Sequence, residues 1–464
     1  METAYLKGAK EAWMRKSTSL PLAEVEPGEP SVRANGESER LKILWIKMGG
    51  LYPVNTGGRL RSFHILTELS KKHDVTVLTT HVPGEDPDMH EKHLPGCKKV
   101  ISIPFSAPRR DSGKFLIALV RSWFSVLPVD MYKFRLSRIR REVSDVLAKE
   151  NFNLCIADFL YAVANVPDNI GVPLIYFSHN VEFMIWQRLC RNETNPVKKA
   201  ILALEWRKMR HYESSVCKAS DMTISVSEQD CELFNAQAPG SCVRDIPTGV
   251  DIDFFKSENL KENPLELVFS GSMDWHPNED AILHFIDAIL PLIRHRVPQV
   301  SLTVVGRNPS TKLVNAALEA GVEVTGTVDD IRPYVDQAAV YIVPLRVGGG
   351  TRLKIFEALS MGKAVVSTTV GAEGLPLEEG RHIVRADDAV SFADEVVNLL
   401  YDGDRRQRLG EAGRQLMEEK FSWARVGDAF ESRCREVKAA DGDTYRRREH
   451  AINSQGSKGG VNAE

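Results

Sequence analysis

The stretch VYIVPLRVGGGTRLKIFEALSMGKAVVS, residues 340–367, contains the pattern that decides the fold. Its first four residues are an apolar run typical of a buried strand, and the three glycines at 348–350 predict a turn. Apolar residues at helical spacing then lead to a second apolar run at 364–367. A strand, a tight turn, a helix and another strand in this order are typical of a βαβ unit in a parallel sheet.

The same alternation of short apolar runs and longer amphipathic stretches fills most of the chain, in two series. In the first series a strand at 41–46 precedes a turn at Gly57-Gly58 and a helix, and further strands are expected at 75–79, 154–157, 174–177 and 222–225. The second series predicts strands at 265–269, 301–305, 322–324, 340–343 and 364–367. We therefore predict the α/β class, with two doubly wound, Rossmann-like domains and a ligand cleft between them, beyond the carboxyl ends of the strands.

The domain boundaries follow from these two series. We predict a first domain over residues 41–258, a second over 265–420, and a helix over 421–438 that packs back toward the first domain. Residues 1–40 and 439–464 are rich in small and polar residues and have no sustained apolar period. We expect both ends to be disordered tails.

Composition argues against several classes of protein. Among 464 residues, 60 Lys and Arg nearly balance 63 Asp and Glu, and the resulting net charge of -3 disfavours nucleic-acid binding. Seven scattered cysteines without a CxxC pair predict neither a disulfide framework nor a zinc site, and they fit a reducing compartment. No apolar run approaches the roughly 20 residues of a membrane span. We expect a cytoplasmic protein, either free or peripherally attached at the inner face of the membrane.

The glycine turn of the opening stretch has the chemistry of an anion site. Glycines let a backbone approach a ligand closely, Thr351 can cap the following helix, and the free N–H groups at a helix start favour a phosphate. Arg352 and Lys354 add positive charge where a helix selected only for stability would prefer acids. The carboxylate of Glu357, further along the helix, could accept hydrogen bonds from the two hydroxyls of a ribose.

These features resemble the donor-binding region of the retaining GT-B glycosyltransferases of family 4. The resemblance extends over most of residues 41–435, and the order and spacing of its motifs make it specific. The motifs that carry it are residues 57–58, 178–182, 247–255, 269–273, 304–309 and 348–374. It implies that the two domains face each other across a cleft and that the second one binds a nucleotide-sugar donor.

The resemblance also implies roles for residues of the second domain. Glu357 matches the family's acidic residue that contacts the ribose, and Gly349, Gly350 and Thr351 would face the donor sugar and the diphosphate through their backbone. Gly271 follows the first strand of the second domain within a shared motif and belongs to the donor side. Arg307 would lie against the nucleotide base, with a surface salt bridge as the alternative.

In the first domain the resemblance implies two further contacts. His179 matches the histidine near the primary hydroxyl of the donor sugar, and Gly58 matches the glycine loop that meets the diphosphate and the acceptor side. Asp158 and Glu182 follow predicted strands and are candidates for the acceptor side, or else are acids that cap a turn or a helix.

Two departures from the family pattern affect the donor site. Position 349 is Gly where many members carry a Glu that contacts the sugar, and the segment Gly271–Asn278 lacks the Arg and Lys that many members use to bind the diphosphate. Our hypothesis is that Arg352 and Lys354 replace this pair as the catalytic cations that stabilise the leaving diphosphate.

No metal and no resident cofactor are expected. Asp251 and Asp253 form a DxD pair that could hold a metal ion, but they lie in a Gly-Val-Asp turn that resembles one of the family. Fixed cations and N–H donors can stabilise a leaving diphosphate instead. The co-substrate would be a nucleoside-diphosphate sugar.

The function implied is transfer of a sugar, with retention of configuration, to a saccharide or lipid-linked acceptor in cell-surface polysaccharide or glycolipid synthesis. A GT-B nucleotide-sugar epimerase and a non-catalytic nucleotide-sugar-binding protein stay open as alternatives. A dehydrogenase is disfavoured because no strand is followed by GxGxxG. Residues 123–141 mix aromatic and basic side chains, typical either of contact with an anionic membrane or of a solvated basic helix.

Overall fold

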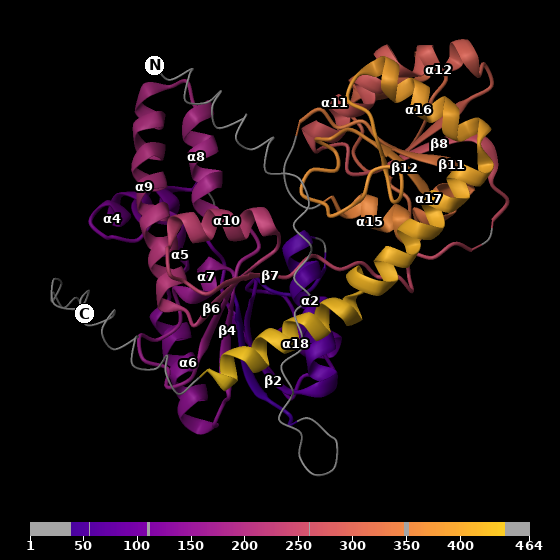
Figure 1. Cartoon of the computed structure of the whole chain (residues 1–464). Helices are drawn as coiled ribbons and strands as arrows, with labels where there is room; N and C mark the ends of the chain where they lie inside the picture. The colour runs from indigo at the N-terminus through magenta and orange to yellow at the C-terminus, as the bar shows by residue number, and fades with distance from the viewer. Residues whose placement is uncertain (1–38, 55, 109–111, 259, 348–351, 441–464) are drawn as a thin grey trace. The chain divides into compact units, whose positions relative to one another are not determined.

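A computed structural model describes residues 39–54, 56–108, 112–258, 260–347 and 352–440. Both predicted tails lie outside these ranges, except for short stretches next to the folded part. So do the glycine turn at 348–350 and Thr351. The described residues form two parallel sheets, each flanked by helices (Figure 1). The predicted α/β class with two Rossmann-like sheets is confirmed.

The first sheet has the strand order β3-β2-β1-β4-β5-β6-β7, with every neighbouring pair parallel. This order reverses direction between β1 and β4, which makes that point the topological switch of the sheet. The strands are β1 (Lys42–Lys47), β2 (Asp74–His81), β3 (Lys99–Pro104), β4 (Leu154–Asp158), β5 (Leu174–Phe177), β6 (Met222–Ser225) and β7 (Val243–Asp245).

The second sheet repeats this plan with the order β10-β9-β8-β11-β12-β13, again parallel throughout. Its switch point lies between β8 and β11. The strands are β8 (Asn263–Ser270), β9 (Ser301–Val305), β10 (Glu323–Gly326), β11 (Ala338–Val343), β12 (Ala364–Ser367) and β13 (Val384–Arg385).

Helices connect the strands of each sheet. Those of the first series are α2 (Gly57–Lys72), α3 (Met89–His93), α4 (Gly113–Trp123), α5 (Val129–Phe134), α6 (Ser137–Lys149), α7 (Leu160–Val163), α8 (Glu182–Asn192), α9 (Pro196–Ala219) and α10 (Glu228–Gln237). Those of the second are α11 (His276–His284), η1 (Phe285–Ile289), α12 (Leu290–Arg296), α13 (Thr311–Glu319), α14 (Arg332–Gln337), α15 (Leu353–Ser360), α16 (Ala389–Tyr401), α17 (Gly403–Leu416), η2 (Met417–Phe421) and, last in the chain, α18 (Trp423–Ala439).

The boundaries correct two of the sequence-based expectations. The glycines 57 and 58 do not form a turn ahead of the helix, because α2 begins at Gly57 and the hydroxyl of Thr56 caps it by accepting from Arg59 N. In the donor segment, α15 begins at Leu353 and Arg352 occupies the N-cap position, so Arg352 precedes the first turn instead of lying in it.

The last helix, α18, packs against the core of the first sheet. Its Phe430 has no exposed surface, and its ring centroid lies 5.7 Å from that of Trp45 and 5.1 Å from that of Phe177. In Figure 1 α18 runs beside α2, and an ion pair of 2.9 Å joins Lys72 Nζ of α2 to Glu431 Oε2 of α18. The C-terminal segment therefore completes the hydrophobic core of the first sheet.

Within the part of the chain that the structure describes, no helix combines the length and the apolar character needed to cross a bilayer.

Candidate functional site

The switch point of the first sheet places two opposite charges side by side. Lys47 ends β1 and Asp158 ends β4, and the two residues are register partners in the parallel pair. Doubly wound sheets bind ligands beyond the carboxyl ends of their strands at such a point. Both side chains are almost fully buried, at 2% and 0% exposed, and their ion pair measures 3.1 Å.

Asp158 is the centre of a buried hydrogen-bond network. Its Oδ2 accepts from the indole Nε1 of Trp45 at 3.0 Å, and its Oδ1 accepts from Lys47 Nζ and lies 2.8 Å from His179 Nε2. The carboxylate is enclosed by these three side chains. It can therefore affect the acceptor side only by positioning Trp45, Lys47 and His179.

His179 lies between Asp158 and Arg61. Arg61 Nη1 lies 3.0 Å from His179 Nδ1. Because a guanidinium only donates, Nδ1 must accept, and the ring proton is on Nε2, which donates to Asp158. Arg61 also donates through Nε to the hydroxyl of Thr248 at 2.9 Å. Both ring nitrogens of His179 are therefore engaged, and the ring orientation is fixed.

The charges of this network follow from burial and pairing. Burial lowers the pKa of His179 to about 3, although Asp158 opposes the shift, so the ring is neutral at physiological pH. Burial alone would raise the pKa of Asp158, but Lys47 and His179 outweigh it and bring that pKa to about 2. Burial also lowers the pKa of Lys47.

Phe159 forms the wall between this network and the start of α2. Its backbone has a φ of 73°, which is rare for a residue with a side chain, and its ring stacks on His179 with centroids 3.9 Å apart. A Cβ on Gly58 would lie 2.5 Å from Cζ of Phe159. Gly58 therefore permits the close approach of α2 to the ring that supports His179.

Glu182 is the first residue of α8 and is buried, at 7% exposed. Burial raises its pKa to about 7, and the nearby Asp130 adds to the shift. The N–H groups of Glu182 and Phe183 donate to the carboxyl oxygens of the buried Glu213 at 3.1 and 2.9 Å. Glu213 thus fixes the start of α8, and Glu182 contributes a carboxyl that titrates near neutrality.

In the second sheet, Lys354 reaches from α15 to the segment after β8. Its Nζ donates to the Asn278 side-chain oxygen at 2.8 Å and lies 4.0 Å from the ring centroid of Phe269. A Cβ on Gly271 would be 2.6 Å from this Nζ, so the lysine needs the space that the glycine leaves open. The structure thus places a cation from α15 beside the residues at the end of β8 and just after it.

Glu357 lies one turn beyond Lys354 on the same helix. Burial lowers the pKa of Lys354 to about 7, against the attraction of Glu357, and burial raises the pKa of Glu357 to about 7, against the attraction of Lys354. The two groups share one desolvated environment. The protonation of Lys354 and of Glu357 can therefore change when a ligand that carries charge or hydroxyl groups binds beside them.

The two arginines predicted at this site differ in exposure. Arg352 is 3% exposed, its Nη2 donates to Val370 O at 3.4 Å, and its guanidinium lies 5.8 Å from the ring centroid of Trp275. Burial lowers its pKa. Arg307 is exposed, and its Nε donates to the hydroxyl of Ser272 at 2.9 Å. Arg352 is therefore held beside the start of α15, and Arg307 lies on the loop after β9.

Three predicted contacts, Gly349, Gly350 and Thr351, lie outside the described residues. The DxD pair lies inside them and forms a turn, in which Asp251 Oδ1 accepts from the backbone N–H of Asp253 and of Phe254. Across the described ranges no three His, Cys, Asp or Glu side chains come together as a metal site requires.

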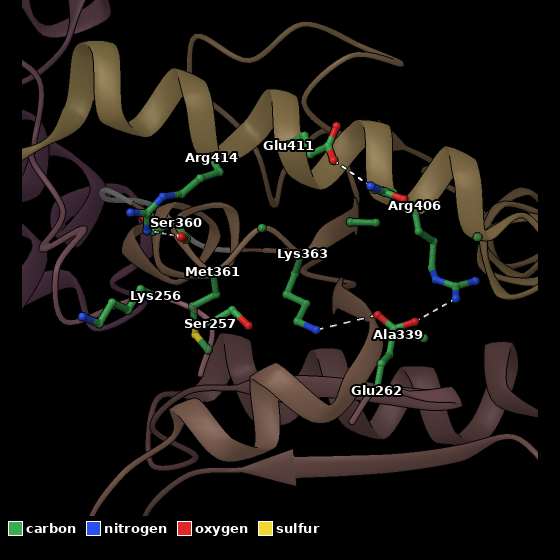
Figure 2. Close-up of a pocket in the computed structure, with 14 residues that line it drawn as sticks. Lys256, Ser257, Glu262, Ala339, Ser360, Met361, Lys363, Arg406, Glu411 and Arg414 are labelled. Atoms are coloured by element: carbon green, nitrogen blue, oxygen red, sulfur yellow. Dashed lines mark hydrogen bonds and ion pairs between the residues drawn. The ribbon is translucent and has the colours of Figure 1, made fainter. Parts of the chain in front are cut away.

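A cavity of about 480 Å³ lies at the other end of the second sheet (Figure 2). Three of its cations, Lys363, Arg406 and Arg414, are bonded within the chain. Lys363 Nζ donates to Ala338 O at 2.9 Å, and Glu262 bridges Lys363 and Arg406. Arg414 donates to backbone carbonyls. The cavity lies at the amino ends of β11 and β12, away from the switch point, so we assign it no part in the chemistry.

Lys47, Arg61 and Asn278 are among the residues of these networks that sequence reasoning missed. Lys47 directly follows a run of apolar residues, and a charged residue at the end of a buried strand is a signal that could have indicated it. Arg61 and Asn278 have no such signal, because their partners are distant in the sequence.

Two models of known protein families match parts of this chain. The model described as Glycosyltransferase Family 4 matches residues 57–254, and the one described as Glycosyl transferases group 1 matches residues 264–402. The first match covers the sheet that contains His179 and the second covers the sheet that contains Lys354.

Individual proteins are also similar to this chain in sequence or in structure. An uncharacterized 44.6 kDa protein of the cps region of Klebsiella pneumoniae is 23% identical over 77% of this chain and 90% of its own. A phosphatidyl-myo-inositol mannosyltransferase of Mycobacterium tuberculosis is 30% identical over 42% of this chain and 54% of its own. The solved structure of sucrose-phosphate synthase from Thermosynechococcus elongatus superimposes with a TM-score of 0.60 at 18% identity, over 86% of this chain and all of that one.

Proposed function

We propose that this chain, a glycosyltransferase of the GT-B fold, moves a sugar from a nucleoside-diphosphate sugar to a saccharide or lipid-linked acceptor with retention of configuration. We further propose that it does so without a metal ion or a resident cofactor. The observation that carries the proposal is Lys354, held by Asn278 at the carboxyl end of β8, with Glu357 one turn away.

In this proposal Lys354 and Arg352 hold the diphosphate of the donor. Transfer leaves negative charge on the departing diphosphate, and desolvated cations stabilise that charge far more than solvated ones do. Lys354 is lined by Phe269 and Asn278, which keep it oriented. Glu357 would accept from the ribose hydroxyls, and Gly349, Gly350 and Thr351 would supply N–H donors. Arg307 would lie against the base.

The first sheet would hold the donor sugar and the acceptor. We propose that His179 and Gly58 lie near the sugar. Because both nitrogens of His179 are engaged, any contact with a hydroxyl would require the ring to exchange one of its present partners. Asp158 would then act as a positioning residue that fixes the tautomer of His179. Glu182 would serve the acceptor side as a carboxyl near its titration point.

The biological setting is also a proposal. The named relatives include a mannosyltransferase that acts on a phosphatidyl-inositol lipid and a protein of a cps region, which supports a role in glycolipid or cell-surface polysaccharide synthesis. All seven cysteines are free thiols, which supports a reducing, cytoplasmic compartment.

A thermal-shift screen tests the donor site. The chain is melted with uridine, guanosine or adenosine diphosphate and with the corresponding nucleotide sugars. A ligand that binds only the folded chain raises the melting temperature by mass action, so we expect one nucleoside diphosphate to stabilise the wild type. Lys354→Gln should weaken that binding by about tenfold or more, since a charge-assisted contact contributes about 1.5–3 kcal/mol.

The matched control is Lys312→Gln on α13, which removes an exposed lysine from the same domain and should leave binding unchanged. If no nucleoside diphosphate shifts the melting temperature even at millimolar concentration, the proposal is wrong. Release of nucleoside diphosphate from a nucleotide sugar in the absence of any acceptor would favour an epimerase.

A further inference from the structure

The helix α4 has two apolar faces. Phe115 and Leu119 lie on the inner one and pack against the cluster of buried residues beneath α4. Ser122 on the same face is completely buried, and its carbonyl accepts from Lys208 Nζ of α9 at 2.7 Å. The inner face therefore attaches α4 to the body of the first domain and fixes which side chains point outward.

The outer face of α4 and the residues that follow it are apolar and exposed. Leu116, Val120 and Phe124 follow at intervals of four residues, which places them on one side of a helix. Including their neighbours, the exposed fractions are Leu116 60%, Ile117 55%, Val120 41%, Trp123 44%, Phe124 89% and Val126 80%. We call these six residues the outer face.

Such a cluster differs from ordinary surface composition. Single exposed apolar residues are normal, but contiguous apolar patches mark sites of interaction. The outer face brings six large apolar side chains, two of them aromatic, into eleven consecutive residues. Figure 1 shows α4 at the left margin of the first domain, beyond α5 and α9.

The charged residues of α4 itself, Lys114 and Arg121, are both cations. The neighbouring helix α5 adds Lys133 and one acid, Asp130. That acid is buried and paired with Lys133, so it does not offset the exposed cations. Lys114 and Arg121 are exposed on α4 itself, three residues before and four residues after Ile117.

We propose that the outer face of α4 docks the chain on the surface of an anionic lipid bilayer. Helices with Trp, Phe and Leu on one face and with Lys and Arg beside it lie in the interface plane with their apolar side chains among the acyl chains. The long side chains of Lys114 and Arg121 can extend to the headgroup phosphates. The glycosyltransferase would then work at the plane where lipid-linked acceptors lie.

Charge favours a bilayer over a second copy of the chain. A two-fold interface through this face would bring Lys114 and Arg121 of each copy close to the same cations of its partner, and like charges at an interface disfavour association. An anionic lipid surface complements both the apolar and the basic part of the face. Docking is measured without donor, acceptor or turnover, so its outcome is independent of the proposed function.

Vesicle sedimentation of the full chain tests the docking. We expect the wild type to pellet with vesicles of phosphatidylcholine and phosphatidylglycerol, less so as salt rises, and weakly with phosphatidylcholine alone. The double substitution Ile117→Glu with Phe124→Glu should lower the partition coefficient by at least about tenfold, since it removes two apolar anchors and adds two negative charges. Both positions are exposed, so the fold should be retained, which circular dichroism checks.

The matched control is Leu318→Glu with Val390→Glu, which makes the same change of charge at two exposed apolar positions of the second domain, on α13 and α16. It should pellet nearly as well as the wild type. The proposal is overturned if the wild type does not pellet with anionic vesicles, or if the α4 variant and the control pellet equally. A dimer that the α4 variant abolishes, without vesicle binding, would also overturn it and would assign the face to a second copy.

Discussion

At the scale of single residues, the pair Lys354 and Glu357 has the chemistry that the proposed donor site requires. Each group is desolvated enough to move its pKa to about 7, from opposite directions. A charged ligand can therefore change the protonation of the pair when it binds. A merely structural surface pair on a helix would keep its ordinary pKa values and would contribute little.

The affinity for the nucleoside diphosphate should depend on pH through this pair. Glu357 gains a proton as pH falls through about 7 and then accepts ribose hydroxyls less well, while Lys354 loses its charge as pH rises through about 7 and then binds diphosphate less well. Affinity, measured by calorimetry, should therefore be highest near pH 7 and decline on both sides.

The variant Lys354→Arg distinguishes the alkaline decline in affinity, which depends on Lys354, from the acid decline, which depends on Glu357. Arginine keeps its charge in this pH range, so the decline on the alkaline side should disappear while the acid side stays. An affinity that does not change between about pH 6 and pH 8 in the wild type would show that neither group responds to the donor.

The first-domain network shows what residue-level reasoning from the sequence could and could not predict. The motif around His179 indicated a functional histidine, but the contacts that bring Lys47 to Asp158 and Arg61 to His179 join residues more than a hundred positions apart. No local pattern contains such contacts. Asp158 was expected at the acceptor side, and the structure shows it enclosed among its donors.

At the scale of elements, the C-terminal helix α18 contributes buried side chains to the core of the first sheet. Its Phe430 is completely buried between Trp45 and Phe177 of the first sheet, although the whole second sheet and its helices, residues 263–421, come before it in the chain. Stability of the first sheet should therefore depend on the C-terminal helix.

Phe430→Ala should destabilise the chain by about 3–5 kcal/mol, because it removes a large buried side chain and leaves a cavity. The midpoint of urea unfolding measures this loss. As a control, Phe124→Ala removes an equally large side chain that is 89% exposed, and the midpoint should hardly change. Equal midpoints for Phe430→Ala and the wild type would mean that α18 is dispensable to this core.

The elements that sequence patterns did not predict are explained by their position. β3, β7 and β13 were missed, and each is an edge strand of its sheet. An edge strand lacks a neighbour on one side and need not be a continuous apolar run, and β7 and β13 contain only three and two residues. The central strands, buried on both faces, were predicted to within about two residues.

At the scale of the whole molecule, both sheets have the same doubly wound order, and in each the candidate residues lie at the switch point. Lys47 and Asp158 occupy it in the first sheet, and Lys354 reaches the corresponding place after β8 in the second. The repeated alternation of strand and helix patterns was enough to predict this plan. The particular sugar, base and acceptor depend on contact shapes that no pattern in the chain encodes.

Transfer itself tests the central claim most directly. The chain is incubated with the nucleotide sugar that stabilises it and with saccharide or lipid-linked acceptors, and proton NMR identifies the new glycoside and its anomeric configuration. We predict that release of nucleoside diphosphate depends on an acceptor and that the product keeps the anomeric configuration of the donor. A nucleotide sugar left intact with every acceptor, or a product of inverted configuration, would contradict the account.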